Sequence, residues 1–85
     1  MELVEYRQMA GVTQEVMARH MGLPLRTYEN IEAGRVEFRP VHANAARWAL
    51  VEITVAHDDA RWLPQGIADR IMDAAKLIDK EKGGH

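Results

Sequence analysis

The sequence predicts an all-α protein with five helices. In five successive segments, apolar residues recur at spacings of three and four, as they do in helices that bury one face. Gly11, Gly22 and Gly34 follow the first three segments, and glycine readily takes the left-handed conformation that ends a helix. The chain has 85 residues, which suffice for one small hydrophobic core and not for two independent ones.

The first helix is expected over residues 2–10. Its apolar stripe begins with Leu3 and Tyr6. The stripe ends at either Met9 or Ala10, because both continue the helical spacing. This helix should rest on the core.

The stretch from Thr13 to Gly34 predicts two short helices that cross at a tight turn. Thr13 suits the N-cap of the second helix, since its hydroxyl can accept from a first-turn N–H. Ala18 and Gly22 are small, so the two helix backbones can approach closely there. The residues that should face inward are Val16, Met17, Met21, Leu23, Tyr28 and Ile31.

The third helix is expected over about residues 24–32 and the fourth from Pro40 or Val41 to about Ala56. Pro24 cannot cap with its side chain but suits a first helical position, which can shift the start of the third helix by one residue. Phe38, in the loop between these helices, should plug the core. The inward side of the fourth helix is expected to comprise Ala45, Ala46, Ala49, Leu50 and Ile53, while Trp48 either covers the edge of the core or meets a partner subunit.

The last helix is expected over about residues 65–80. Its apolar stripe is Ile67, Ile71, Ala74, Ala75 and Ile78, broadened by Met72 and Leu77. Two alternatives account for this stripe. Either it forms a dimer interface together with the preceding apolar pair, or it packs back on its own domain. The interface residues would be Trp62, Leu63, Ile67, Ile71, Ala74 and Ile78.

The motif residues resemble those of the phage-repressor-like family of helix-turn-helix proteins, the Cro/cI or lambda-repressor-like type. The residues that carry the resemblance are Arg7, Thr13, Gln14, Ala18, Gly22, Glu32, Ala33, Gly34, Pro40 and Leu50. They cover roughly the first two thirds of the chain. The resemblance implies a five-helix lambda-repressor-like domain, with a helix-turn-helix DNA-binding part over residues 1–57. Residues 58–85 would be a C-terminal helical extension within the same compact domain, used for dimerisation.

The resemblance also implies roles for individual residues. Arg7 would form a structural ion pair with Glu32, tying the first helix to the third. Leu25, Arg26 and Asn30 would contact bases, because arginine can form a bidentate pair with guanine and asparagine with adenine. Contacts with the DNA backbone would come from Gln14, Thr27, Arg35 and Arg39. Glu29 must either point sideways or accept from a cytosine amino group.

Charge and composition narrow the function further. The formal net charge is −2, although binders of nucleic acid usually carry a basic surface. Arginines gather in or beside the helix-turn-helix, which predicts a locally positive face; they are Arg7, Arg19, Arg26, Arg35 and Arg39. Cysteine is absent, and neither a metal-ligand spacing nor a nucleophile motif occurs, so we expect no enzyme, no metal and no cofactor. No apolar run is long enough to span a membrane and no signal peptide is visible, so we expect a cytoplasmic protein without membrane contact.

These features favour a homodimeric transcriptional regulator that binds a palindromic operator in double-stranded DNA. The choice of repressor over activator rests on the family resemblance alone. The alternative is a protein-binding module or an antitoxin-type adaptor, in which the last helix docks a protein partner. The acidic net charge and Glu29 favour that alternative.

Overall fold

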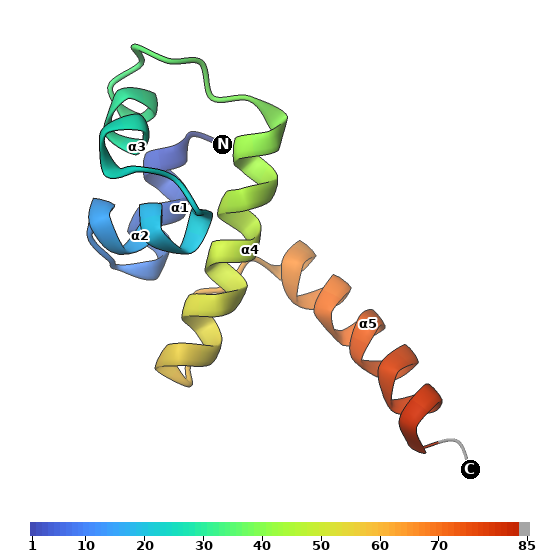
Figure 1. Cartoon of the computed structure of the whole chain (residues 1–85). Coiled ribbons are helices and arrows are strands. Elements are labelled where there is room, and N and C mark those ends of the chain that lie inside the picture. Colours follow the sequence, from blue (N-terminus) through green and yellow to red (C-terminus); the bar gives the residue numbers. More distant parts are fainter. Residues whose placement is uncertain (84–85) are drawn as a thin grey trace.

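The computed structural model describes residues 1–83, and within them the chain forms five α-helices and no β-strand (Figure 1). The expected all-α class with five helices is confirmed. The helices are α1 (Leu3–Ala10), α2 (Gln14–Met21), α3 (Leu25–Glu32), α4 (Pro40–His57) and α5 (Gln65–Gly83). The last helix is longer than expected, since it continues beyond residue 80.

Local chemistry sets the ends of the short helices. Gly11, Gly22 and Gly34 all have positive φ, between 65° and 79°. After α3, the N–H of Gly34 donates to the carbonyl of Ile31 and the next N–H reaches back to Asn30, which satisfies two carbonyls at the helix end. At the start of α2, the Thr13 hydroxyl accepts from the N–H of Val16 at 3.2 Å, as expected of an N-cap.

Pro24 stands just outside α3 and not in its first turn. Its φ of −59° and ψ of 143° are extended, and its carbonyl accepts the first helical hydrogen bond from Tyr28 at 3.1 Å. No side chain caps this end. The helix therefore begins one residue later than the spacing suggested, at Leu25.

One hydrophobic core joins the first four helices. Its buried residues are Leu3, Tyr6, Ala10, Met17, Ala18, Met21, Tyr28, Ile31, Ala46, Ala49, Leu50 and Ile53. The stripe of α1 thus ends at Ala10, while Met9 is only partly buried. Val16 was expected to face inward, but it is partly exposed and lies outside this core, because the inner side of α2 is occupied by Met17 and Met21.

The connecting loop contributes to the core as expected. Phe38 packs against the buried cluster, with its ring 6.3 Å from that of Tyr6 in an edge-on arrangement. It also stacks on His42 in the first turn of α4. These contacts hold the loop against the middle of α1 and the first turn of α4.

The last helix leaves the body formed by α1 to α4 and projects away from it (Figure 1). The molecule is consequently elongated, with principal extents of 52 × 23 × 20 Å. Trp62, Leu63 and Ile67 pack against the core of their own chain. No helix within residues 1–83 has the length and apolar character needed to cross a membrane.

Candidate nucleic-acid interface

The carboxylate of Glu32, at the end of α3, is the centre of a polar cluster that fixes the helix-turn-helix. The Arg7 guanidinium from α1 contacts it twice, with Nε 2.7 Å from Oε2 and Nη2 3.1 Å from Oε1. The Gln14 amide from α2 donates to Oε1 at 2.9 Å, and the Tyr28 hydroxyl donates to Oε2. The expected ion pair between α1 and α3 is therefore present, and it is joined by two hydrogen bonds that the sequence analysis did not predict.

This cluster is largely shielded from water, and the side chain of Glu32 is only 8% exposed. Burial alone would raise the pKa of Glu32, but the hydrogen bonds from Arg7, Tyr28 and Gln14 outweigh it and hold the pKa below its usual value. Burial and the neighbouring carboxylate raise the pKa of Tyr28. At neutral pH the cluster is thus an ionised carboxylate with three donors, which joins α1, α2 and α3.

Because its inner side is held this way, α3 presents its other side to solvent. Tyr28 and Ile31 are buried, whereas Arg26 and Glu29 are exposed. Leu25 is 39% exposed, so it lies on the outer side at the start of the helix. Thr27 and Asn30 are partly exposed.

Asn30 and Arg35 lie together at the end of α3. The guanidinium of Arg35 donates to Oδ1 of Asn30 at 3.2 Å. The turn at Gly34 brings the chain back over the last turn of α3, which places residue 35 beside residue 30. An expected base-contacting residue and an expected phosphate-contacting residue are therefore neighbours.

Gln14, the first residue of α2, is turned towards the polar cluster and not fully exposed to solvent. It is partly buried, and its amide is directed at Glu32. As the first residue of α2, it keeps a backbone N–H that has no partner inside the helix. That N–H remains available to an anion at this helix end.

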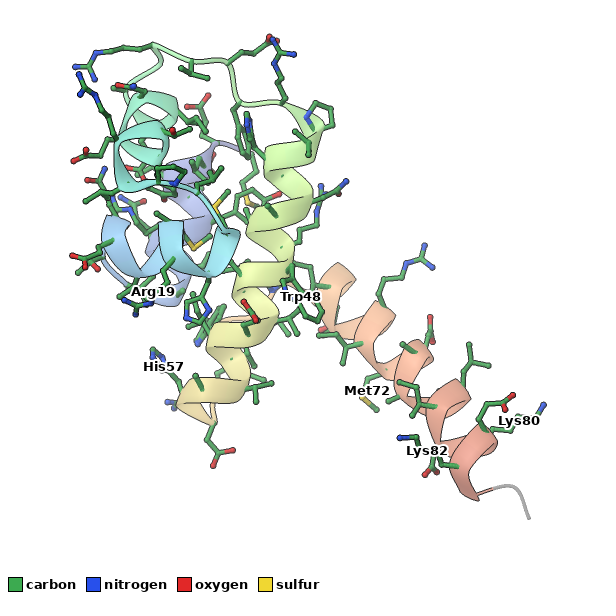
Figure 2. All side chains as sticks on the ribbon, in the orientation of Figure 1. Arg19, Trp48, His57, Met72, Lys80 and Lys82 are labelled. Atoms are coloured by element: carbon green, nitrogen blue, oxygen red, sulfur yellow. The ribbon has the colours of Figure 1, made fainter. Side chains whose placement is uncertain are left out.

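The charges around the α3–α4 loop are mixed. Arg39 is 66% exposed and lies 3.8 Å from the carboxylate of Glu37, which is itself 78% exposed. Arg19 does not join the loop arginines, because it lies beside α2 at the opposite side of the body from the loop (Figure 2). The positive face expected from the sequence is therefore narrower, with Arg26, Arg35 and Arg39 interspersed with acidic residues.

A second candidate surface is a groove of about 650 Å³ between α4 and α5. Trp48, Val51, Ile71 and Ala74 help to line it. Trp48 is 61% exposed and lies between α4 and the first turn of α5 (Figure 2). Trp48 was expected either to cover the edge of the core or to meet a partner subunit. With 61% of it exposed, the side chain is not buried by the core of its own chain.

Of the six residues expected at a dimer interface, four are partly buried and two are exposed. Trp62, Leu63 and Ile67 are partly buried against their own core, which fits the alternative of intramolecular packing. Ile71 is partly buried, whereas Ala74 and Ile78 are exposed. The second half of α5 therefore has no cover from the described residues.

Two histidines, His20 and His42, contribute to a helix end and to contacts between helices. His42 accepts from the N–H of Arg39 at 3.0 Å, which caps the start of α4. The Nδ1 of His20 lies 3.2 Å from Oε1 of Glu52 and links α2 to α4. Among residues 1–83, no group of three His, Asp or Glu side chains is arranged to hold a metal ion.

No family model, no curated protein and no solved structure matches the chain. The resemblance to repressor-like proteins accordingly remains an expectation drawn from the motif residues.

Proposed function

We propose that this chain is a sequence-specific, DNA-binding transcriptional regulator that acts in the cytoplasm as a homodimeric repressor on a palindromic operator. The observation that carries the proposal is the division of α3 into two sides. Its inner side is fixed by Tyr28 and by the Glu32 cluster, while Leu25 and Arg26 project outward. A short helix held rigidly at a protein surface is the element that helix-turn-helix proteins insert into the major groove.

The exposed residues of α3 have the chemistry for reading base edges. Arg26 carries a guanidinium that can donate two hydrogen bonds to O6 and N7 of guanine. The Oδ1 of Asn30 accepts from Arg35 and retains a second lone pair, so the amide can still pair with adenine. Leu25 offers an apolar contact for the methyl group of thymine.

Phosphate contacts would flank these base contacts. Arg35 and Arg39 are exposed beside the end of α3, and Thr27 lies at its rim. The ion pair between Arg39 and Glu37 competes only weakly with a phosphate for the guanidinium, because ion pairs between exposed side chains contribute little free energy. At the other edge, the N-terminus of α2 with Gln14 provides N–H groups for a phosphate oxygen.

The test is the binding of duplex DNA by Arg26→Ala. We expect a loss of preference at one position of each half-site, worth about 1–3 kcal/mol of discrimination, with the other positions unaffected. The matched control is Arg61→Ala, since Arg61 is 90% exposed and paired with Asp59 away from α3. If Arg26→Ala keeps the full base preference, the role assigned to this residue is wrong.

A second candidate function is that of a protein-binding module or antitoxin-type adaptor. It is favoured by the exposure of Met72, Leu77 and Ile78 on α5, each more than half accessible. The two candidates differ in their dependence on salt. An operator-binding protein should lose affinity steeply as salt rises, whereas an apolar docking contact should change little.

A further inference from the structure

The groove between α4 and α5 is lined by apolar side chains from both helices. Trp48 and Val51 line it from α4, and Ile67 and Ile71 line it from α5. Its volume of about 650 Å³ lies within the range of roughly 300–1,000 Å³ that is typical of small-molecule sites. Trp48 is 61% exposed, so the groove offers a large apolar surface that the chain itself leaves in contact with water.

Each wall of the groove also carries one arginine. Arg47 precedes Trp48 on α4, and Arg70 lies three residues after Ile67, on the same side of α5. Among the described residues that line the groove, these two carry the only charged side chains, and neither is acidic. The whole chain has more acidic than basic residues, 13 against 11, so the positive lining is a local feature.

Neither arginine is engaged by a carboxylate of the chain. Within residues 1–83, no ion pair involves Arg47 or Arg70. Nη1 of Arg47 donates to Oδ1 of Asn44 at 2.7 Å, which leaves its other N–H groups for a second acceptor. Asn44 also lines the groove, so this hydrogen bond holds the guanidinium beside the apolar surface. A guanidinium can bind a carboxylate through two parallel hydrogen bonds.

From this combination we propose that the groove binds a small amphipathic carboxylate, a molecule with an apolar chain or ring system and one acidic group. The apolar part would lie against Trp48 and Ile71, and the carboxylate would be bound by Arg47 and Arg70. A neutral apolar molecule would gain nothing from the arginines, and a cation would be repelled by them. A small hydrophilic anion would leave the apolar lining in water.

This site is separate from the surface that the proposed function uses. None of the described residues that line the groove belongs to α3. A ligand there would contact both α4 and α5, and would add apolar contacts between the body and the helix that projects from it (Figure 1). The inference therefore goes beyond the proposed function and does not depend on DNA binding.

Three ligands with the same ten-carbon chain test the charge selection: decanoate, 1-decanol and decyltrimethylammonium. Isothermal titration calorimetry measures their affinities for the full chain at neutral pH, below the concentrations at which they form micelles. Decanoate should bind about tenfold more tightly than decanol, because charge-assisted hydrogen bonds are stronger than neutral ones, and the cation should bind most weakly. The net charge of −2 favours the cation, so preference for the anion would report the local arginines. Equal affinities, or no binding of decanoate, would overturn the proposal.

Charge removal tests the two arginines. Arg47→Gln and Arg70→Gln should each weaken the binding of decanoate by about fivefold and leave the binding of decanol unchanged. Lys76→Gln is the matched control, because it removes a positive charge from an exposed residue of α5 that does not line the groove. If this control weakens decanoate binding as much as Arg70→Gln does, the arginines do not hold the carboxylate.

A bulky side chain tests the location. Ala74→Phe should weaken the binding of both decanoate and decanol, because residue 74 lines the groove, whereas Ala75→Phe should not, because residue 75 is exposed outside it. Decanoate should also shift the fluorescence of the natural chain to shorter wavelength as water leaves the indole of Trp48. Trp48→Phe should abolish that shift, which separates Trp48 from Trp62. Undiminished binding by Ala74→Phe, with unchanged helical circular dichroism, would place the ligand elsewhere and overturn the site.

A second copy of the chain is the competing occupant of the groove. If sedimentation shows self-association that Ala74→Phe abolishes, and decanoate does not bind, the groove is a contact between copies and the ligand proposal is wrong. These experiments contain no DNA, so their failure differs from a failure of the proposed function. A chain that binds duplex DNA but not decanoate would refute this site alone, and a chain that binds decanoate but no duplex would refute the regulatory function alone.

Discussion

Replacing Arg7 by methionine tests whether the Glu32 cluster holds the helix-turn-helix together. Methionine keeps most of the apolar stem of the side chain and removes the charge, leaving Glu32 with only the hydrogen bonds from Tyr28 and Gln14. Breaking a fully buried pair costs about 3–5 kcal/mol. Glu32 is 8% exposed but Arg7 is 22% exposed, so we expect a smaller loss of about 2–3 kcal/mol in the free energy of unfolding.

For a domain of this size, that loss corresponds to a decrease in Tm of roughly 10–20 °C. The assay is urea unfolding at neutral and acidic pH. The folded state holds the pKa of Glu32 below the ordinary carboxyl value of 4.5, so its stabilisation is complete above that value and is lost as the pH falls through the folded-state pKa. The difference between Arg7→Met and the natural chain should therefore shrink as the pH falls.

The control is Arg61→Met, because its pair with Asp59 is almost fully exposed on the arginine side and ion pairs between exposed side chains contribute little to stability. If Arg7→Met costs no more than this control, the cluster does not stabilise the fold as described. A cost that stays the same at acidic pH would show that the charge of Glu32 is not involved.

The other predictions concern the core, a helix end and one titration. Leu50→Ala should lower the free energy of unfolding by about 2–5 kcal/mol, since Leu50 is fully buried; a loss below 1 kcal/mol, roughly, in urea unfolding would contradict its place in the core. Thr13→Ala should cost about 1 kcal/mol through the lost cap of α2, whereas Thr13→Asn should largely preserve stability. Hydrogen bonds from Arg61 lower the pKa of Asp59 to about 2, so an NMR titration should place its midpoint there and Arg61→Ala should move it towards the usual 3.8.

Much of the helical architecture could be predicted from short-range chemistry. Glycines at positions 11, 22 and 34 mark the ends of α1, α2 and α3, because each takes the left-handed conformation there. The spacing of apolar residues identified most of the core, since a helix that buries one face repeats its apolar residues every three or four positions. Val16 is the exception. Met17 and Met21 occupy the buried side of α2, which leaves Val16 partly exposed.

The polar cluster was only partly predictable. Tyr28 and Glu32 stand four residues apart on one helix, and this spacing alone could have indicated their hydrogen bond. The approach of Gln14 depends on how α2 packs against α3, which is a tertiary property. The contact between Asn30 and Arg35 likewise requires the backbone turn at Gly34, which spacing does not reveal.

The periodicity of the last helix identified its apolar stripe but not what covers it. Trp62 and Leu63 in the turn before α5, together with Ile67 in its first turn, pack against the core, while the remainder of the helix projects away from the body. The direction in which α5 leaves the body is set by packing between distant segments. A sequence pattern therefore predicted both alternatives for this stripe without choosing between them.

The claim that α3 reads DNA can be tested most directly by selecting bound sequences from a pool of randomised duplexes. We expect enrichment of a two-fold symmetric sequence whose half-sites lie about 10 base pairs apart, or a multiple of that spacing. The Arg26→Ala variant should relax the preference at one position in each half-site. Recovery of the input pool without any enriched sequence, at salt concentrations low enough to retain phosphate contacts, would contradict this claim.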